Sequence, residues 1–254
     1  MGLLENRING PRPRGSHGLV VEELGRAIVS GEIPQGAILP GDQELMERFG
    51  VSRTVLREAM KTLAAKRLIQ AKSRVGTRVL ERVRWNFVDS DVMGWRLGAG
   101  VDLDFVVHLA EMRLALEPAA AALAARHATS DEIVALYALA ARMEDLAHTR
   151  ESIAKTDLDF HIAIAECSRN PFMRSVSSLI EAALAVSLQL SSPALSPSGI
   201  ATCAANHLRI AHAIAARDPD RAAAAMRAVI DEGVARITQA LDVPPLGTAG
   251  GAGA

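Results

Sequence analysis

The chain has 254 residues, of which 49% are hydrophobic and 22% are charged, and its formal net charge at pH 7 is −1. This length allows two domains, each with its own core. Two cysteines and the lack of a signal-like apolar start argue against a disulfide framework and against secretion, and no apolar run approaches the roughly 20 residues of a membrane span. We therefore expect a cytoplasmic protein that makes no membrane contact.

The charge is distributed unevenly along the chain. Residues 1–84 contain 15 Lys and Arg against 9 Asp and Glu, whereas the remainder contains 13 against 20. A basic region of this kind suits phosphate binding, because cationic side chains displace counterions from DNA. Composition predicts disordered ends over 1–16 and 243–254, a basic domain over 17–83, a linker over 84–98 and an acidic helical domain over 99–242.

The basic domain begins with three predicted helices. The first spans residues 19–30 and turns Leu19, Leu24, Ala27 and Ile28 inward. The second ends at Gly50, and Ser52 can cap the third, which continues to Leu68. The apolar positions of the second and third helices are Leu45, Met46, Phe49, Val55, Leu56, Ala59, Met60 and Leu63. Two short amphipathic helices joined by a tight turn are typical of a helix-turn-helix.

The third helix has the polar pattern of a recognition helix. Arg53, Thr54 and Arg57 lie away from its apolar face. The first residues of such a helix meet base edges in the major groove, and Arg is suited to bidentate contact with guanine. The alternative is an amphipathic helix whose cationic surface is only solvated.

Residues 69–79 predict two short strands around a basic tip. Lys72, Arg74 and the backbone of Gly76 would lie against the DNA backbone or in the minor groove. Three helices followed by such a wing make a winged helix.

One run of residues in this domain is specific to a known family. It comprises Leu39-Pro40, Leu45, Phe49-Gly50-Val51-Ser52-Arg53, Leu56-Arg57-Glu58-Ala59, Leu63, Leu68-Ile69, Gly76-Thr77 and Val79. Over about residues 17–80 the run resembles the N-terminal domain of GntR-family bacterial transcription regulators. The resemblance implies that Arg53 and Arg57 contact operator DNA, helped by Ser52, Thr54 and the wing. One departure is Gln43, at a position where related proteins often carry a basic residue.

The connector contains both tryptophans of the chain, Trp85 and Trp95. In a chain with 3% aromatic residues, they indicate either a docked linker that fixes the orientation of the two domains or a helix that packs on its own domain. The connector resembles that of the FadR-like branch of the family, whose ligand-binding FCD domain is all helical, and most closely that of regulators of the D-galactonate operon.

From Asp102 onward the pattern is almost entirely helical, which makes the protein mainly α. Helices are predicted over about 102–126 with a kink or break at Pro118, and over 129–147, 152–168, 170–190, 200–216 and 218–241. The many alanines allow close packing in an antiparallel bundle of about six helices. Cys167 and Cys203 are expected to be small buried apolar residues.

One set of polar residues in the bundle can bind a metal. Asp157 and His161 share a helix face, and His207 lies on a later helix. Such ligands suit zinc, nickel or manganese, although an Asp-x-x-x-His pair alone is more often an ordinary polar pair. FadR-like regulators use an Asp, a His four residues later and two further His residues, so the resemblance implies a divalent metal, with zinc first. The last His is replaced by Val229, which leaves either a site of three protein ligands or one that has lost its metal.

Arg113 is the predicted effector-binding residue. It falls among inward-facing apolar neighbours, and a buried guanidinium requires an anion. That anion is either Glu117, four residues later, or the carboxylate of a ligand. The family resemblance favours the ligand. Arg113 and a metal would together hold a hydroxy acid.

These features predict a homodimeric repressor on double-stranded operator DNA, released by a sugar acid or another small hydroxy-carboxylate such as D-galactonate. There are two alternatives. One is a metal-dependent hydrolase in which Asp157, His161 and His207 activate water. The other is a DNA-binding protein whose bundle only dimerises. The DNA-binding domain and the lack of a separate general base at motif spacing argue against the enzyme.

Overall fold

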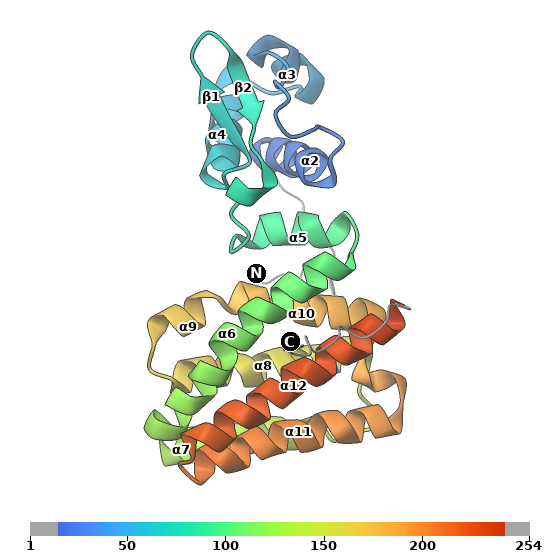
Figure 1. The fold of residues 1–254 in the computed structure, drawn as a ribbon. Helices are drawn as coiled ribbons and strands as arrows, with labels where there is room; N and C mark the ends of the chain where they lie inside the picture. The colour runs from blue at the N-terminus through green and yellow to red at the C-terminus, as the bar shows by residue number, and fades with distance from the viewer. Residues whose placement is uncertain (1–14, 242–254) are drawn as a thin grey trace, which may run out of the picture. The chain divides into compact units, whose positions relative to one another are not determined.

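The computed structural model of the protein describes residues 15–241 and divides into two compact units between Val101 and Asp102 (Figure 1). The two terminal segments predicted to be disordered, 1–16 and 243–254, lie outside the described residues, apart from Gly15 and Ser16. Gly15 is the N-cap of the first described helix and Ser16 is its first residue, so these two belong to the fold.

The N-terminal unit is a winged helix-turn-helix followed by one further helix. Its elements are α2 (Ser16–Ser30), α3 (Asp42–Phe49), α4 (Arg53–Ala65), β1 (Ile69–Lys72), β2 (Gly76–Val79), the 3-10 helix η1 (Arg82–Arg84) and α5 (Ser90–Gly98). The two strands are antiparallel, with Ile69 opposite Val79 and Lys72 opposite Gly76. They form the predicted wing.

The turn between α3 and α4 depends on two residues that the sequence singles out. Gly50 ends α3 in the left-handed region at φ 62°, where a glycine is the least strained residue. Ser52 caps α4, and its side chain accepts a hydrogen bond from the backbone N–H of Val55 at 3.4 Å. The predicted continuation of α4 to Leu68 is wrong, because the helix ends at Ala65 and Arg67 takes a positive φ of 57°.

The first helix also differs from its predicted face. Leu24, Ala27 and Ile28 are buried, but Leu19 is 46% exposed. Val20 and Val21 are buried instead and belong, like Leu24 and Ile28, to the hydrophobic core of the N-terminal unit.

The connector forms α5, and it packs within the N-terminal unit. Trp85 and Trp95 belong to the same hydrophobic core as the helix-turn-helix. The indole N–H of Trp85 donates to the carbonyl of Leu80 at 3.0 Å, and Lys66 forms an ion pair with Asp89 at 2.7 Å. The tryptophans therefore match the interpretation of a helix that packs on its own domain.

The C-terminal unit is a bundle of helices (Figure 1). Its elements are α6 (Leu103–His127), α7 (Ser130–Arg142), α8 (Arg150–Cys167), α9 (Pro171–Ser175), α10 (Ser177–Leu190), the 3-10 helix η2 (Pro193–Leu195), α11 (Pro197–Ala215) and α12 (Pro219–Ala240). We call this the helical unit. The mainly α fold class is confirmed.

Three details of the helical unit depart from the sequence prediction. Helix α6 runs through Pro118 without the break that was one of the two predicted alternatives, since a proline removes one intrahelical hydrogen bond but leaves the others. Helix α7 ends at Arg142, earlier than predicted. The fourth predicted helix is divided at Val176 into α9 and α10.

Small side chains allow the helices of this unit to approach closely. Ala120, Ala121 and Ala124 of α6 are buried in the same core as Phe160 of α8 and Ile210 of α11. Helix α12 packs along α6 and α11. The inward faces of α6, α8 and α11 therefore meet, and polar residues on these faces are brought together. Between residues 15 and 241 no helix is long and apolar enough to span a membrane.

Candidate functional site

The start of α4 presents the predicted recognition residues on the surface. Ser52, Arg53, Thr54 and Arg57 are all exposed, while Leu56 on the opposite face is fully buried. Neither arginine forms a salt bridge with another residue in the described part of the chain. The guanidinium groups are thus available for phosphates or base edges.

The wing presents the other predicted DNA-contacting residues. Lys72, Arg74 and Gly76 are exposed around the turn between β1 and β2. Arg74 has a φ of 62° and Gly76 a φ of 105°, so the tip is a tight turn with two residues in the left-handed region. A side chain at Gly76 would also press on Ile38, whose Cγ2 would lie 3.0 Å from the added Cβ. The glycine therefore fixes the shape of the tip.

A cavity lies among α6, α8, α10, α11 and α12 of the helical unit. Its polar lining residues are Arg113, Asp157, His161, Ser187, Cys203, Asn206, His207, Glu232 and Arg236, and its apolar walls include Val106, Leu109, Val229 and Ile237. The cavity volume of about 40 Å³ holds about three waters, since each water needs roughly 10–15 Å³ by this measure. A ligand larger than this space must move the walls.

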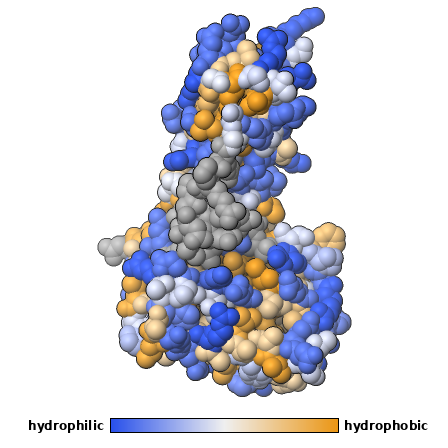
Figure 2. All heavy atoms as spheres, turned by 180° about the vertical axis from the view of Figure 1, so that it is seen from behind, coloured by the Kyte–Doolittle hydropathy of each residue, from blue (hydrophilic) through white to orange (hydrophobic). Residues whose placement is uncertain are grey.

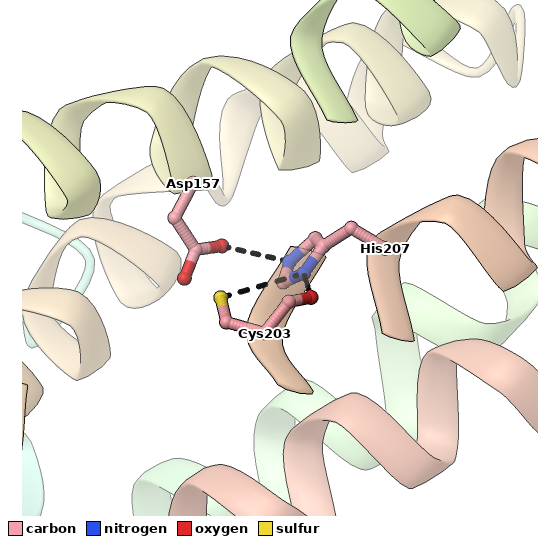
Figure 3. Close-up of side chains that lie close together, drawn as sticks. All are labelled: Asp157, Cys203 and His207. Atoms are coloured by element: carbon pink, nitrogen blue, oxygen red, sulfur yellow. Dashed lines mark hydrogen bonds and ion pairs between the residues drawn. The ribbon is translucent and has the colours of Figure 1, made fainter. Parts of the chain in front are cut away.

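Asp157 connects the two predicted histidines. One of its carboxylate oxygens, Oδ1, lies 3.1 Å from Nε2 of His161 and 3.1 Å from Nε2 of His207. In Figure 3, Asp157 on α8 faces His207 and Cys203 on α11. Nδ1 of His207 lies 2.7 Å from the carbonyl oxygen of Cys203 and donates to it when protonated, which leaves Nε2 directed at Asp157. A backbone contact of this kind fixes the tautomer of metal-binding histidines.

His161 is held between two carboxylates. Its Nδ1 lies 2.5 Å from Oε2 of Glu117. These nitrogen–oxygen distances are short, but among the described residues neither ring nitrogen of His161 has a hydrogen-bond partner of suitable geometry. The contacts of His161 are therefore ion pairs rather than hydrogen bonds of regular geometry.

Arg113 lines the cavity and also forms an ion pair. Its Nε donates to Oε1 of Glu117 at 2.5 Å, and both side chains are at least nine-tenths buried. The structure thus contains the predicted pairing with Glu117, and it also places the guanidinium on the cavity wall, where a ligand anion could compete with Glu117.

The pKa values show how these charges support one another. Burial alone raises the pKa of Asp157, but His207 and His161 bring it well below its ordinary value. Burial alone lowers the pKa of both histidines. Asp157 nevertheless raises the pKa of His207 well above its usual range, and Glu117 and Asp157 raise the pKa of His161. Arg113 and His161 lower the pKa of Glu117 to about 2 despite its burial. Cations and carboxylates therefore alternate through the site.

The residues fit a divalent metal. Ligand atoms of Asp157, Cys203 and His207 lie within 4.8 Å of one another, and His161 approaches the same carboxylate. Carboxylate, imidazole and thiolate groups are the usual ligands of zinc, which would provide a positive charge at this point. Val229 lines the cavity without a ligand atom, in agreement with the departure noted in the sequence.

Several residues of the site were not predicted from the sequence. Glu232 accepts hydrogen bonds from Asn206 and, at 2.6 Å, from Nη1 of Arg236, and these three residues form one wall of the cavity. Nε of Arg236 is buried without a hydrogen-bond partner in the described chain. The spacing of four residues between Glu232 and Arg236, and between Cys203 and His207, is the signal that could have identified them.

A winged helix-turn-helix with exposed arginines, followed by an all-helical unit with a charged internal cavity, defines the class as DNA-binding transcription regulators. The chain belongs to the GntR family: the profile of bacterial regulatory proteins, gntR family, matches residues 18–79, and that of the FCD domain matches residues 108–232. The protein binds operator DNA as a transcription regulator and is not an enzyme, so the hydrolase alternative is set aside.

Several relatives are transcription regulators. The chain is 40% identical over 163 residues to the uncharacterized HTH-type transcriptional regulator YieP of Escherichia coli, covering 63% of this chain and 71% of YieP. It is 35% identical over 158 residues to the galactonate operon transcriptional repressor of Escherichia coli, covering 62% and 69%. It is 32% identical over 217 residues to the repressor NanR of Klebsiella aerogenes, covering 82% and 80%.

Solved structures agree on the fold. The structure of Lar, which controls the expression of the Listeria monocytogenes agr system, aligns with a TM-score of 0.59 at 20% identity, over 90% of this chain and 99% of that one. McbR/YncC of Escherichia coli aligns with a TM-score of 0.50 at 18% identity, over 89% and 99%.

Proposed function

We propose that the protein is a homodimeric repressor that leaves its operator when a small hydroxy-carboxylate binds in the cavity of the helical unit. The observation that carries this proposal is the cavity itself, where Arg113 and the Asp157–His161–His207 group lie between apolar helices. The galactonate operon repressor and NanR are repressors among the relatives, so sugar acids such as D-galactonate are the first candidates for the effector.

We assign DNA contact to the start of α4 and to the wing. In this proposal Arg53 and Arg57 meet base edges in the major groove, while Ser52 and Thr54 contact the adjacent backbone. The wing residues Lys72, Arg74 and Gly76 contact phosphates or the minor groove. The exposure of all seven side chains or backbones supports this assignment.

For the effector, we assign the carboxylate to Arg113 and the hydroxyl oxygens to a metal held by Asp157, His161 and His207. Zinc is the first candidate for the metal, with nickel and manganese as alternatives. A ligand carboxylate that pairs with Arg113 replaces part of the contact to Glu117 on the same helix. Because the cavity is small, a ligand bound in it would displace α6, which forms part of its wall. Helix α6 begins directly after the boundary between the units, so we propose that this displacement is how ligand binding alters the conformations available to the DNA-binding unit.

We further propose that two protomers associate through their helical units in the cytoplasm, which places two recognition helices on a pseudo-palindromic operator. Apolar side chains exposed on the helical unit support such an interface, and they include Met112, Val134, Leu146, Phe172 and Leu195. In Figure 2, hydrophobic residues appear among hydrophilic ones on the visible face of this unit. Light scattering of the purified protein gives the mass directly, and a monomer at operator-binding concentrations would refute the dimer.

Two substitutions separate the proposed sites. Arg57→Ala should abolish the operator shift in a gel assay and leave calorimetric binding of D-galactonate unchanged. Arg26→Ala, which removes the same charge from an exposed position of α2, is its control. Arg113→Ala should retain the operator shift and lose both sugar-acid binding and release by the acid, with the exposed Arg221→Ala as its control.

The outcomes distinguish the candidates. Saturable heat with an aldonic acid, together with release of the operator, supports the repressor. No heat with any member of an aldonic acid panel, with or without zinc, would support a bundle that only dimerises. Equal loss of both functions in either variant would contradict separate sites.

A further inference from the structure

We propose that Cys203 is a metal ligand, whose thiolate binds the same ion as Asp157 and His207 and makes the site selective for zinc. The inference rests on the metal-binding part of the proposed function. From the sequence alone, Cys203 is expected only to be a small buried apolar residue.

The position of Cys203 is the first argument. Cys203 and His207 are four residues apart on α11, so they project from the same face towards Asp157 on α8 (Figure 3). The Cys203 side chain is buried on the cavity wall, and its sulfur lies 3.7 Å from Nδ1 of His207, on the ring whose other nitrogen, Nε2, is directed at Asp157. Nitrogen, oxygen and sulfur atoms around one tetrahedral zinc lie about 3.3–3.6 Å apart, given bonds of about 2.0–2.3 Å. The ligand atoms of the three residues are within 4.8 Å of one another, so modest side-chain adjustments bring them onto one ion.

His161 supplies an independent argument. Its side chain is 1% exposed, and its Nε2, which lies 3.1 Å from Oδ1 of Asp157, has no hydrogen-bond partner of suitable geometry in the described chain. This nitrogen and the carboxylate oxygen face one another, so an ion bound to Asp157 would lie within reach of Nε2 and give it a partner of suitable geometry. Together with Cys203, the site then has four protein ligands although Val229 contributes none.

The thiolate has consequences for the choice of metal. Soft sulfur ligands favour zinc over manganese, whereas carboxylate and imidazole ligands alone admit both. Four ligands complete the tetrahedron of a structural zinc, and zinc can expand to five-coordination, which leaves one position for an effector oxygen. Cys203 therefore limits the number of effector oxygens that the metal can hold.

Cys167 offers the matched control. It is also buried, but it lies at the end of α8, outside the cavity-lining residues and the ligand group. Burial raises the pKa of its thiol to about 11, which disfavours the thiolate.

The test uses Co²⁺ as a probe for zinc in the full-length protein. Metal-free protein titrated with Co²⁺ should develop a sulfur-to-cobalt charge-transfer band in the near ultraviolet, and zinc should remove it by displacement. Cys167→Ser should keep the band. Cys203→Ser should lose it, with zinc affinity weakened on the order of 100-fold and an unchanged circular dichroism spectrum.

The inference is overturned if Co²⁺ binds the wild-type protein without this band, if Cys203→Ser retains it, or if no Co²⁺ binds at all. The band is measured on the wild type, so the test does not depend on the folding of the variant. Failure of the proposed function looks different, because a protein that shows the band but never releases its operator with any acid would contradict only the effector role.

Discussion

Glu117 is the residue whose loss should reveal the charge network most clearly. It is 7% exposed, and its two oxygens lie 2.5 Å from Nε of Arg113 and 2.5 Å from Nδ1 of His161. Glu117→Gln keeps the shape of the side chain and removes its charge. Breaking one side of a buried ion pair costs about 3–5 kcal/mol, and a glutamine oxygen can still accept one hydrogen bond, so we expect about 3 kcal/mol of lost unfolding free energy. For a protein of this size, that corresponds to a fall of about 6–12 °C in Tm.

The assay is thermal unfolding at pH 7 in the presence of a chelator, monitored by circular dichroism at a wavelength that reports helix content. Both tryptophans lie in the N-terminal unit, so their fluorescence reports that unit separately. The control is Glu166→Gln, which removes the same charge from an exposed pair with Arg174 and should cost less than about 1 kcal/mol. If Glu117→Gln melts at the temperature of the control, Glu117 does not stabilise the charged Arg113 and His161, and the reasoning fails.

Two further predictions concern stability. Gly25→Ala would place a methyl group against the ring of Trp95, and we expect the overpacking cost of about 1–3 kcal/mol to exceed the helix-propensity gain of about 1 kcal/mol, so the variant should be less stable. Gly98→Ala, which has open space around it, should be more stable than the wild type. Urea unfolding monitored by tryptophan fluorescence measures both changes, and a stabilised Gly25→Ala would contradict the first prediction. The hydrogen bonds from Arg169 at 2.7 Å, and then from the backbone, lower the pKa of Glu132 to about 2. The contribution of the Glu132–Arg169 pair to the free energy of unfolding, about 0.5–1 kcal/mol, is therefore complete above pH about 4.5 and lost as the pH falls towards 2. The stabilities of the wild type and of Glu132→Gln should converge in acid. A difference that stays constant with pH would contradict the role of the charge.

Local signals in the sequence determined much of the N-terminal unit. Gly50 and Ser52 act through backbone conformation and capping, which depend on neighbouring residues along the chain. In the helical unit, the capping box of Thr129 and Glu132 and the Asn170 cap with Pro171 likewise begin helices at the residues where helices were predicted to begin. Helix ends without such a signal were placed less well, as the ends of α4 and α7 show.

The candidate site in the cavity of the helical unit was only partly predictable from the sequence. The spacing of Asp157 and His161 predicts a shared helix face, because helix geometry fixes it, and the apolar neighbours of Arg113 predict that it faces inward. Family resemblance then favoured a metal at Asp157, His161 and His207 and an effector role for Arg113. No pattern in the sequence states which groups from other helices come to face them. The packing of α6 against α8 brings Glu117 into contact with His161 as well as with Arg113. The packing of α12 places Arg236 on the wall of the same cavity.

The sequence by itself determined the class of the protein, because turn residues, helix caps and hydrophobic periodicity act over a few residues and are readable in one dimension. Only the tertiary structure decided the composition of the cavity and the place of α5, because these depend on which buried faces meet. Cys203 illustrates the difference: as a single residue it is an ordinary buried thiol, and it becomes a candidate ligand only when α11 packs it opposite Asp157.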